Sequence, residues 1–161
     1  MSVYQFRDTD YSGTEERDIC GINYANLIRT CAEYASTVSM RIISSENPCI
    51  QQLERFRLHE TDPIEYVYGH YYARDDRRAM HEIRYYRLCP EVIEVLLRIS
   101  DSIFKWISAW GYHNPEDLAF YREDGTVFFD SIVHEGVCNL YPRTGEEVQR
   151  IVQSEGWNKI A

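Results

Sequence analysis

The hydrophobic pattern near the start of the chain changes from a helical period to a strand period. In residues 23–34 the apolar and aromatic positions recur every three or four residues, which predicts an amphipathic helix. The next run, Thr37–Ile42, alternates and is rich in β-branched residues, so it predicts a strand. Asn47 and Pro48 match a helix N-cap followed by a first-turn proline, and a short second helix is expected to run to about His59.

The middle of the chain is less regular. Residues 60–78 are acidic and rich in tyrosine, and their pattern fits either a strand or a long loop. His81–Leu88 places apolar residues between charges and predicts a strand. Pro90 and Glu91 are typical of a helix start, and the apolar face that follows is so broad that this helix is predicted to be buried against a sheet.

The C-terminal third carries the clearest local signal. Leu118–Val133 consists of two aromatic, β-branched runs joined by Asp124-Gly125, a dipeptide that favours the positive φ angles of a tight hairpin turn. Val137–Tyr141 can return as a third antiparallel strand, and Thr144–Glu147 matches a capping box that opens a last helix. The order mixes helices with hairpins, without regular βαβ repeats. We therefore predict an α+β fold in which an antiparallel sheet with a C-terminal hairpin or meander packs against several helices.

The length of 161 residues suits one domain with one hydrophobic core. The first twenty residues are polar and are expected to form an arm or loop before the core, with their order left open. Residues 21–161 are then a single α+β domain.

The composition narrows the cellular setting. The longest uncharged apolar runs are a few residues long and far too short to cross a bilayer, and the N-terminus lacks the pattern of a secretory signal, so a cytoplasmic protein without a membrane partner is expected. The cysteines are odd in number, widely spaced and without a C-x-x-C pair, which argues against a disulfide framework and against a zinc site. We interpret them as reduced, mostly buried thiols: Cys20, Cys31, Cys49, Cys89 and Cys138.

The charge balance points away from nucleic acid. Twenty-six acidic against seventeen basic residues give a net charge of −9, which repels phosphate backbones and favours basic protein partners. The densest basic stretch, Arg74–Arg78, contains two acidic residues and is typical of a solvated loop.

The motifs of common enzymes are missing. The sequence contains no Walker loop, no dinucleotide-binding glycine motif and no nucleophile elbow. His134-Glu135 could begin an H-E-x-x-H zinc motif, but position 138 is Cys138. A local hydrogen-bonded pair at a hairpin end is the simpler interpretation, and a functional site at His134 and Glu135 stays the alternative. No catalytic residue, metal ligand or cofactor is predicted.

Thirteen tyrosines are unusual for this length, and protein interfaces favour tyrosine because it brings a large amphipathic area at low entropy cost. The acidic, tyrosine-rich segment is suited to docking on a basic protein, although an edge strand with solvated acids fits it equally well. The candidate partner-binding residues are Glu60, Asp62, Glu65, Tyr66, Tyr68, Tyr71, Tyr72, Asp75 and Asp76.

Several motifs between residues 80 and 141 resemble those of a family of small bacterial proteins. They are Tyr85-Tyr86-Arg87-Leu88-Cys89-Pro90-Glu91-Val92, Phe104-Lys105-Trp106, Pro115-Glu116-Asp117-Leu118, Asp124-Gly125 and Ser131-Ile132-Val133-His134-Glu135. The family is associated with immunity proteins of polymorphic toxin systems. The resemblance implies a cytosolic protein that binds a toxin domain and blocks it, and it carries over no catalytic residue.

The leading hypothesis is therefore an immunity protein that neutralises a cognate, basic toxin domain through an acidic, tyrosine-rich surface. A small enzyme that uses His134 and Glu135 is the main alternative, and a regulatory protein-interaction module is the second.

Overall fold

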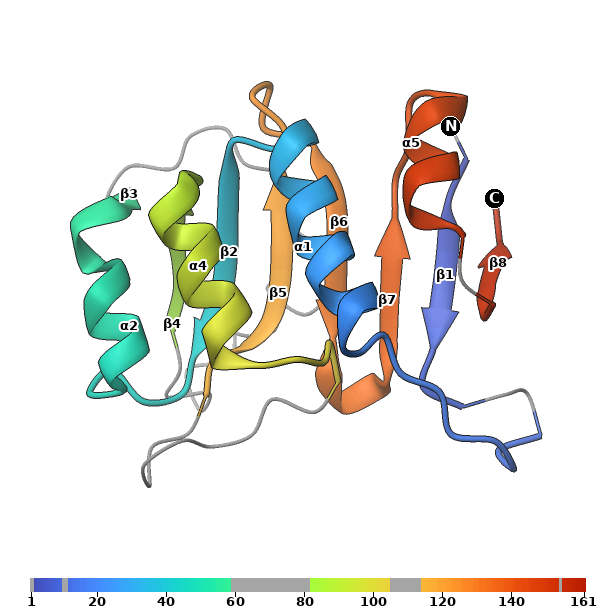
Figure 1. The fold of residues 1–161 in the computed structure, drawn as a ribbon, viewed down its shortest axis with the longest axis horizontal. Helices are drawn as coiled ribbons and strands as arrows, with labels where there is room; N and C mark the ends of the chain where they lie inside the picture. Colours follow the sequence, from blue (N-terminus) through green and yellow to red (C-terminus); the bar gives the residue numbers. More distant parts are fainter. Residues whose placement is uncertain (1, 10–11, 59–81, 105–113, 154) are drawn as a thin grey trace.

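An eight-stranded antiparallel sheet organises the part of the chain that the structure, a computed structural model, describes: residues 2–9, 12–58, 82–104, 114–153 and 155–161. The strand order is β3-β4-β2-β5-β6-β7-β1-β8, and every neighbouring pair is antiparallel (Figure 1). The strands are β1 (Tyr4–Arg7), β2 (Thr37–Ile42), β3 (Arg57–Leu58), β4 (Glu82–Arg87), β5 (Glu116–Tyr121), β6 (Val127–Ile132), β7 (Val137–Leu140) and β8 (Trp157–Lys159).

In the described residues, four helices lie side by side on one face of this sheet (Figure 1). They are α1 (Ile22–Tyr34), α2 (Pro48–Leu53), α4 (Pro90–Ile99) and α5 (Gly145–Ile151). Helix α1 packs between α4 and α5, and α2 packs on the other side of α4. The predicted α+β class, with its meander of β5, β6 and β7, is confirmed. None of the helices in the described ranges is long and apolar enough to span a bilayer. We call the opposite surface of the sheet the far face.

The two predicted elements at residues 23–42 are confirmed as α1 and β2. Helix α1 buries one stripe that includes Tyr24, Leu27, Ile28 and Cys31. The Tyr24 hydroxyl donates a hydrogen bond of 2.7 Å to the Leu96 carbonyl, which ties α1 to α4, and burial raises the pKa of this phenol. Strand β2 alternates as expected, with its apolar side chains in the core between the sheet and the helices.

Helix α2 begins as predicted but ends early. Asn47 caps it, since its Oδ1 accepts a hydrogen bond of 2.9 Å from the Cys49 N–H. The predicted end at His59 is wrong, because the helix stops at Leu53 and a 3₁₀ turn, η1 (Glu54–Phe56), leads into β3. The chain leaves the helix there because the backbone of β3 pairs with β4.

The predicted hairpin between β5 and β6 is confirmed, but its turn is longer than a two-residue Asp-Gly turn. The Arg122 N–H donates to the Thr126 carbonyl over 2.8 Å, which leaves a three-residue loop. Within the loop only Gly125 has a positive φ, of 82°. Asp124 stabilises the turn instead with its side chain, which accepts hydrogen bonds from the Thr126 N–H and hydroxyl.

Strands β1 and β8 were not predicted. The predicted polar arm, residues 1–20, contains β1, which lies inside the sheet between β7 and β8. Phe6 of β1 is 2% exposed and belongs to the core. The arm is therefore part of the folded domain rather than an extension before it.

All five cysteines are free thiols. Cys31 and Cys138 are buried, Cys49 and Cys89 are half-buried and Cys20 is exposed. The expectation of mostly buried thiols therefore holds fully for two of the five.

Helix α5 is attached to the hairpin by a buried ion pair. Thr144 caps the helix, because its Oγ1 accepts from the Glu147 N–H over 3.2 Å. In a full capping box Glu147 would bond back to the Thr144 N–H, but its carboxylate instead pairs with Arg122 through two bonds of 3.0 and 2.9 Å and accepts from the Arg143 N–H. The predicted helix start is confirmed, and its glutamate serves a longer-range contact.

Candidate functional site

The predicted partner-binding segment, Glu60 to Asp76, lies outside the described residues. The candidate residues in it, Glu60, Asp62, Glu65, Tyr66, Tyr68, Tyr71, Tyr72, Asp75 and Asp76, therefore stay predictions.

His134 and Glu135 lie on η2 (Val133–Glu135), the 3₁₀ turn between β6 and β7. The His134 side chain is 71% exposed, and its Nε2 lies 2.9 Å from Glu116 Oε2. Its carboxylate partner is thus a residue of β5 rather than the adjacent Glu135. An imidazole with this exposure lies on the surface and is not enclosed in a deep pocket.

Behind His134, a small ion cluster joins the ends of β2 and β5. Arg41 Nη2 lies 2.7 Å from Glu116 Oε2 and 3.3 Å from Asp117 Oδ2. Asp117 is 2% exposed and has a left-handed φ of 54°, which aspartate tolerates better than most residues. Its Oδ1 accepts a hydrogen bond of 2.9 Å from the Val133 N–H, and burial raises the pKa of the carboxyl. Asp117 therefore fixes η2 and, with it, the position of His134.

A row of aligned side chains crosses the far face. The strand registers place these residues opposite one another in successive pairs, and the alternation of each strand points them away from the described helices. From β4 to β8 the row contains Tyr85, Ser39, Ala119, Asp130, Asn139, Gln5 and Asn158. We call it the polar row.

Hydrogen bonds connect the polar row from β1 to β6. Gln5 Nε2 donates to Asn139 Oδ1 over 3.0 Å, and Asn139 Nδ2 donates to Asp130 Oδ1 over 2.8 Å. The Tyr141 hydroxyl donates to the other oxygen of Asp130, also over 2.8 Å. Asp130 is 3% exposed, and burial raises its pKa to about 6, although these donors favour the charged form. The row thus holds a buried carboxylate through neutral donors.

A third feature gathers carboxylates at one end of the sheet. The arm folds back on itself through a bridge between Thr9 and Glu16, and the Asp8 N–H donates to the Gly136 carbonyl beside η2. A Cβ at Gly136 would collide with the Asp8 carboxylate, so glycine is required for this contact. The hydroxyl of Ser102 donates to Asp18 over 2.5 Å, which brings the loop after α4 to the arm. We call the resulting set the acidic end: Asp8, Glu15, Glu16, Asp18, Asp101 and Glu135.

The acidic end carries more carboxylates than basic side chains. Arg17 pairs with Glu15 at 3.5 Å, and Asp18 is engaged by a neutral hydroxyl. Glu15, Glu16, Asp101 and Glu135 are exposed. In the described part of the chain, no cluster of three or more histidine, cysteine and acidic side chains is placed to hold a metal ion. The acidic end is a surface of concentrated negative charge.

No family model matches the chain, and the comparisons with curated proteins and with solved structures give no match. The resemblance to immunity proteins therefore stays a prediction. The sequence drew attention to His134 and Glu135 through their adjacency, whereas Asp130 and the acidic end follow from strand pairing. A polar residue within each of several strands was the available signal for the row.

Proposed function

We propose that this protein is an immunity-type inhibitor that binds a basic toxin domain and blocks it. The observation that carries the proposal is the acidic end, where backbone pairing and the Ser102–Asp18 hydrogen bond bring together the arm, the loop after α4 and η2. These segments carry four exposed carboxylates, Glu15, Glu16, Asp101 and Glu135, and two half-buried ones, Asp8 and Asp18. The net charge of −9 and the family resemblance of residues 80–141 support the same function.

A concentration of negative charge acts first on the rate at which the two proteins associate. A single-sign surface raises the association rate of an oppositely charged partner and discriminates against partners of like charge. The arm contains two arginines: Arg17, which pairs with Glu15, and Arg7, whose Nε donates to Gln5 Oε1 over 2.9 Å. The six carboxylates of the acidic end outnumber them. A basic partner would therefore meet a surface with a clear excess of negative charge.

The acidic end is also held in place. Strand β1 anchors the arm between two other strands, and the Arg17 N–H donates to the Asp8 carbonyl over 2.5 Å. The Ile103 N–H donates to the Ile19 carbonyl over 3.1 Å and fixes the loop beside it. A preorganised surface loses little entropy on binding, which favours a tight inhibitor.

The test begins with a pull-down from native host lysate at low salt with the tagged protein, followed by purification of the retained toxin domain. The variant Glu16→Lys/Glu135→Lys is then expected to bind that domain at least about tenfold more weakly, with a flatter dependence of Kd on salt. Isothermal titration over a series of salt concentrations measures both quantities.

The matched control is Glu94→Lys/Glu123→Lys. It changes the net charge by the same amount at exposed positions on α4 and on the β5–β6 turn, away from the acidic end. Its Kd is expected to stay within about threefold of the parent protein. If both variants weaken binding equally, total charge rather than the acidic end is responsible. If no partner is retained although one is expressed, the inhibitor function is wrong.

The tyrosine-rich segment is tested in the same titration. If Asp75 and Asp76 contact the toxin domain, Asp75→Lys/Asp76→Lys is expected to weaken binding by a similar factor of about ten and to flatten the salt dependence. An unchanged Kd would remove residues 60–78 from the interface while leaving the acidic end as the binding surface.

A further inference from the structure

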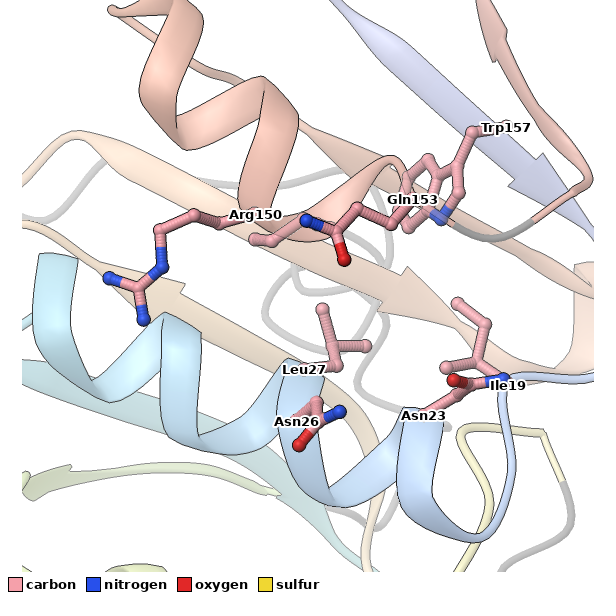
Figure 2. Close-up of a pocket in the computed structure, with 8 residues that line it drawn as sticks. Ile19, Asn23, Asn26, Leu27, Arg150, Gln153 and Trp157 are labelled. Carbon is pink, nitrogen blue, oxygen red and sulfur yellow. The ribbon is translucent and has the colours of Figure 1, made fainter.

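A small hollow lies between the first turns of α1 and the C-terminal end of α5 (Figure 2). Figure 2 shows Leu27 pointing up into it from α1 and the Gln153 carboxamide pointing down into it from the segment after α5. The Trp157 indole of β8 lies at one end, and Arg150 lies at the other. Two stretches that are distant in sequence, residues 19–27 and 150–157, therefore build this site.

The floor of the hollow is apolar and firmly packed. Ile19 and Leu27 are each 4% exposed, and Ile151 is 8% exposed. Trp157 is half-buried, and its ring lies edge-on to Phe6 with centroids 5.7 Å apart. These contacts are made within the core, so the floor is preformed and needs no ordering when a ligand binds.

The rim carries three carboxamides: Asn23, Asn26 and Gln153. All three side chains are exposed. They offer hydrogen-bond donors and acceptors to solvent around an apolar floor, and the half-buried Trp157 adds an indole N–H donor.

Size restricts what can enter. The hollow has a volume of about 50 Å³. A single water needs about 10–15 Å³ on this scale, so the space suits a group of about four atoms. A nucleotide or a sugar ring is too large to be enclosed there, whereas the end of one side chain fits.

Charge further restricts which ligand group can bind in the hollow. Arg150 is the one charged side chain among the eight described residues that line the hollow, and its guanidinium is bound by both oxygens of Glu33. The lining thus contains no carboxylate to neutralise a cation, and its guanidinium is already neutralised. A neutral group that both donates and accepts hydrogen bonds is the best complement to carboxamides and an indole N–H.

We propose that this hollow is a binding site for one neutral primary amide group, of the size of an asparagine or glutamine side chain. The aliphatic stem contacts Leu27 and Trp157, and the amide exchanges hydrogen bonds with the rim carboxamides. The site shares no residue with the acidic end, although its Ile19 directly follows Asp18, and it needs no net charge on its ligand.

The test compares three probes of equal size that differ in charge: propionamide, propionate and propionamidinium. The full-length ¹⁵N-labelled protein is titrated with each, and the indole N–H of Trp157 and the side-chain amide of Gln153 are followed by NMR. Propionamide is expected to bind saturably and at least about fivefold more tightly than either ion, a ratio that corresponds to about one net hydrogen bond. Equal shifts with all three probes, or no saturation with propionamide, would overturn the proposal.

Gln153→Ala is expected to weaken propionamide binding at least about threefold. Gln149→Ala, an exposed position on α5 outside the hollow, is the matched control and is expected to leave it unchanged. Equal affinity of both variants for propionamide would also overturn the proposed site.

To identify the source of the amide, acetyl-Gly-Gln-Gly-N-methylamide is compared with its glutamate analogue. Binding of the glutamine peptide assigns the site to a chain-borne side chain, and binding of propionamide alone assigns it to a free small amide. Because no probe requires a toxin, the result is independent of the inhibitor function.

Discussion

Replacing Arg122 with alanine is expected to lower the free energy of unfolding by about 3–5 kcal/mol. The side chains of Arg122 and Glu147 are 9% and 5% exposed and form a bidentate pair. Removing the arginine leaves the Glu147 carboxylate buried without its cation. The substitution also removes a guanidinium that lies 4.6 Å from the centre of the Phe128 ring and donates to the Tyr141 carbonyl over 3.1 Å.

Arg143→Ala is the matched control, because its guanidinium pairs with Asp124 at 2.6 Å while both side chains are about half exposed, at 45% and 50%. Exposed pairs contribute roughly 0–1 kcal/mol, so this variant is expected to stay close to the parent protein. Urea unfolding measures both, with the m-value as the check that the folded states remain comparable. If Arg122→Ala costs no more than Arg143→Ala, the buried pair does not attach α5 to the hairpin.

Removing one partner of a buried ion pair and replacing both partners have different effects on the free energy of unfolding. Arg122→Met/Glu147→Leu removes both charges and keeps an apolar volume, and such replacements are often neutral or stabilising. We expect the double variant to recover most of the loss caused by Arg122→Ala. The comparison separates the cost of an unpaired charge from the value of the pair itself.

The sequence was sufficient for the elements with long periodic patterns. Helix α4 has six apolar residues on a broad face and a start signal at Pro90. Strands β5 and β6 are six residues each, with four apolar or aromatic residues apiece and a turn signal between them at Asp124-Gly125, and both elements were located correctly. Strands β1 and β8 have only four and three residues, which is too short for a period-two pattern to be recognised. Their place in the sheet depends on pairs such as Gln5 with Asn139, which are distant in sequence.

The contacts of the candidate site were harder to predict from the sequence, because strand pairing brings its residues together. Asp130 is an ordinary acidic residue in the sequence, and its burial arises from the register that places it between Ala119 and Asn139. Likewise, His134 was expected to contact its neighbour, but the left-handed turn at Asp117 brings Glu116 to it instead. The segment from Glu60 to Asp76 remains a sequence-based prediction, because it lies outside the described residues. Its pattern fits a docking surface and an edge strand with solvated acids equally well.

Replacing Asp130 with asparagine is expected to raise the free energy of unfolding at pH 7, by up to about 3 kcal/mol. Burial raises the pKa of Asp130 to about 6 in the folded protein, against about 3.9 in an unfolded chain. The protonated form is therefore favoured by folding, and its stabilising contribution is fully present below about pH 4 and lost as the pH rises through 6. Asparagine keeps the acceptor for Asn139 Nδ2, and the Tyr141 hydroxyl can rotate to accept from the new amide.

Asp124→Asn provides a control of opposite sign. Hydrogen bonds from the Thr126 hydroxyl and from Arg143 hold the pKa of Asp124 well below its usual range, so its stabilisation is present at neutral pH and lost as the pH falls. Unfolding of the parent protein and both variants between pH 4 and 7 gives the two differences directly. The gain from Asp130→Asn should grow with pH over this range, whereas the cost of Asp124→Asn should stay nearly constant and shrink only below about pH 4. A gain that is constant across this range would mean that Asp130 does not lose a proton between pH 4 and 7, and a loss at pH 7 would mean that its charged hydrogen bonds to Asn139 and Tyr141 outweigh its desolvation.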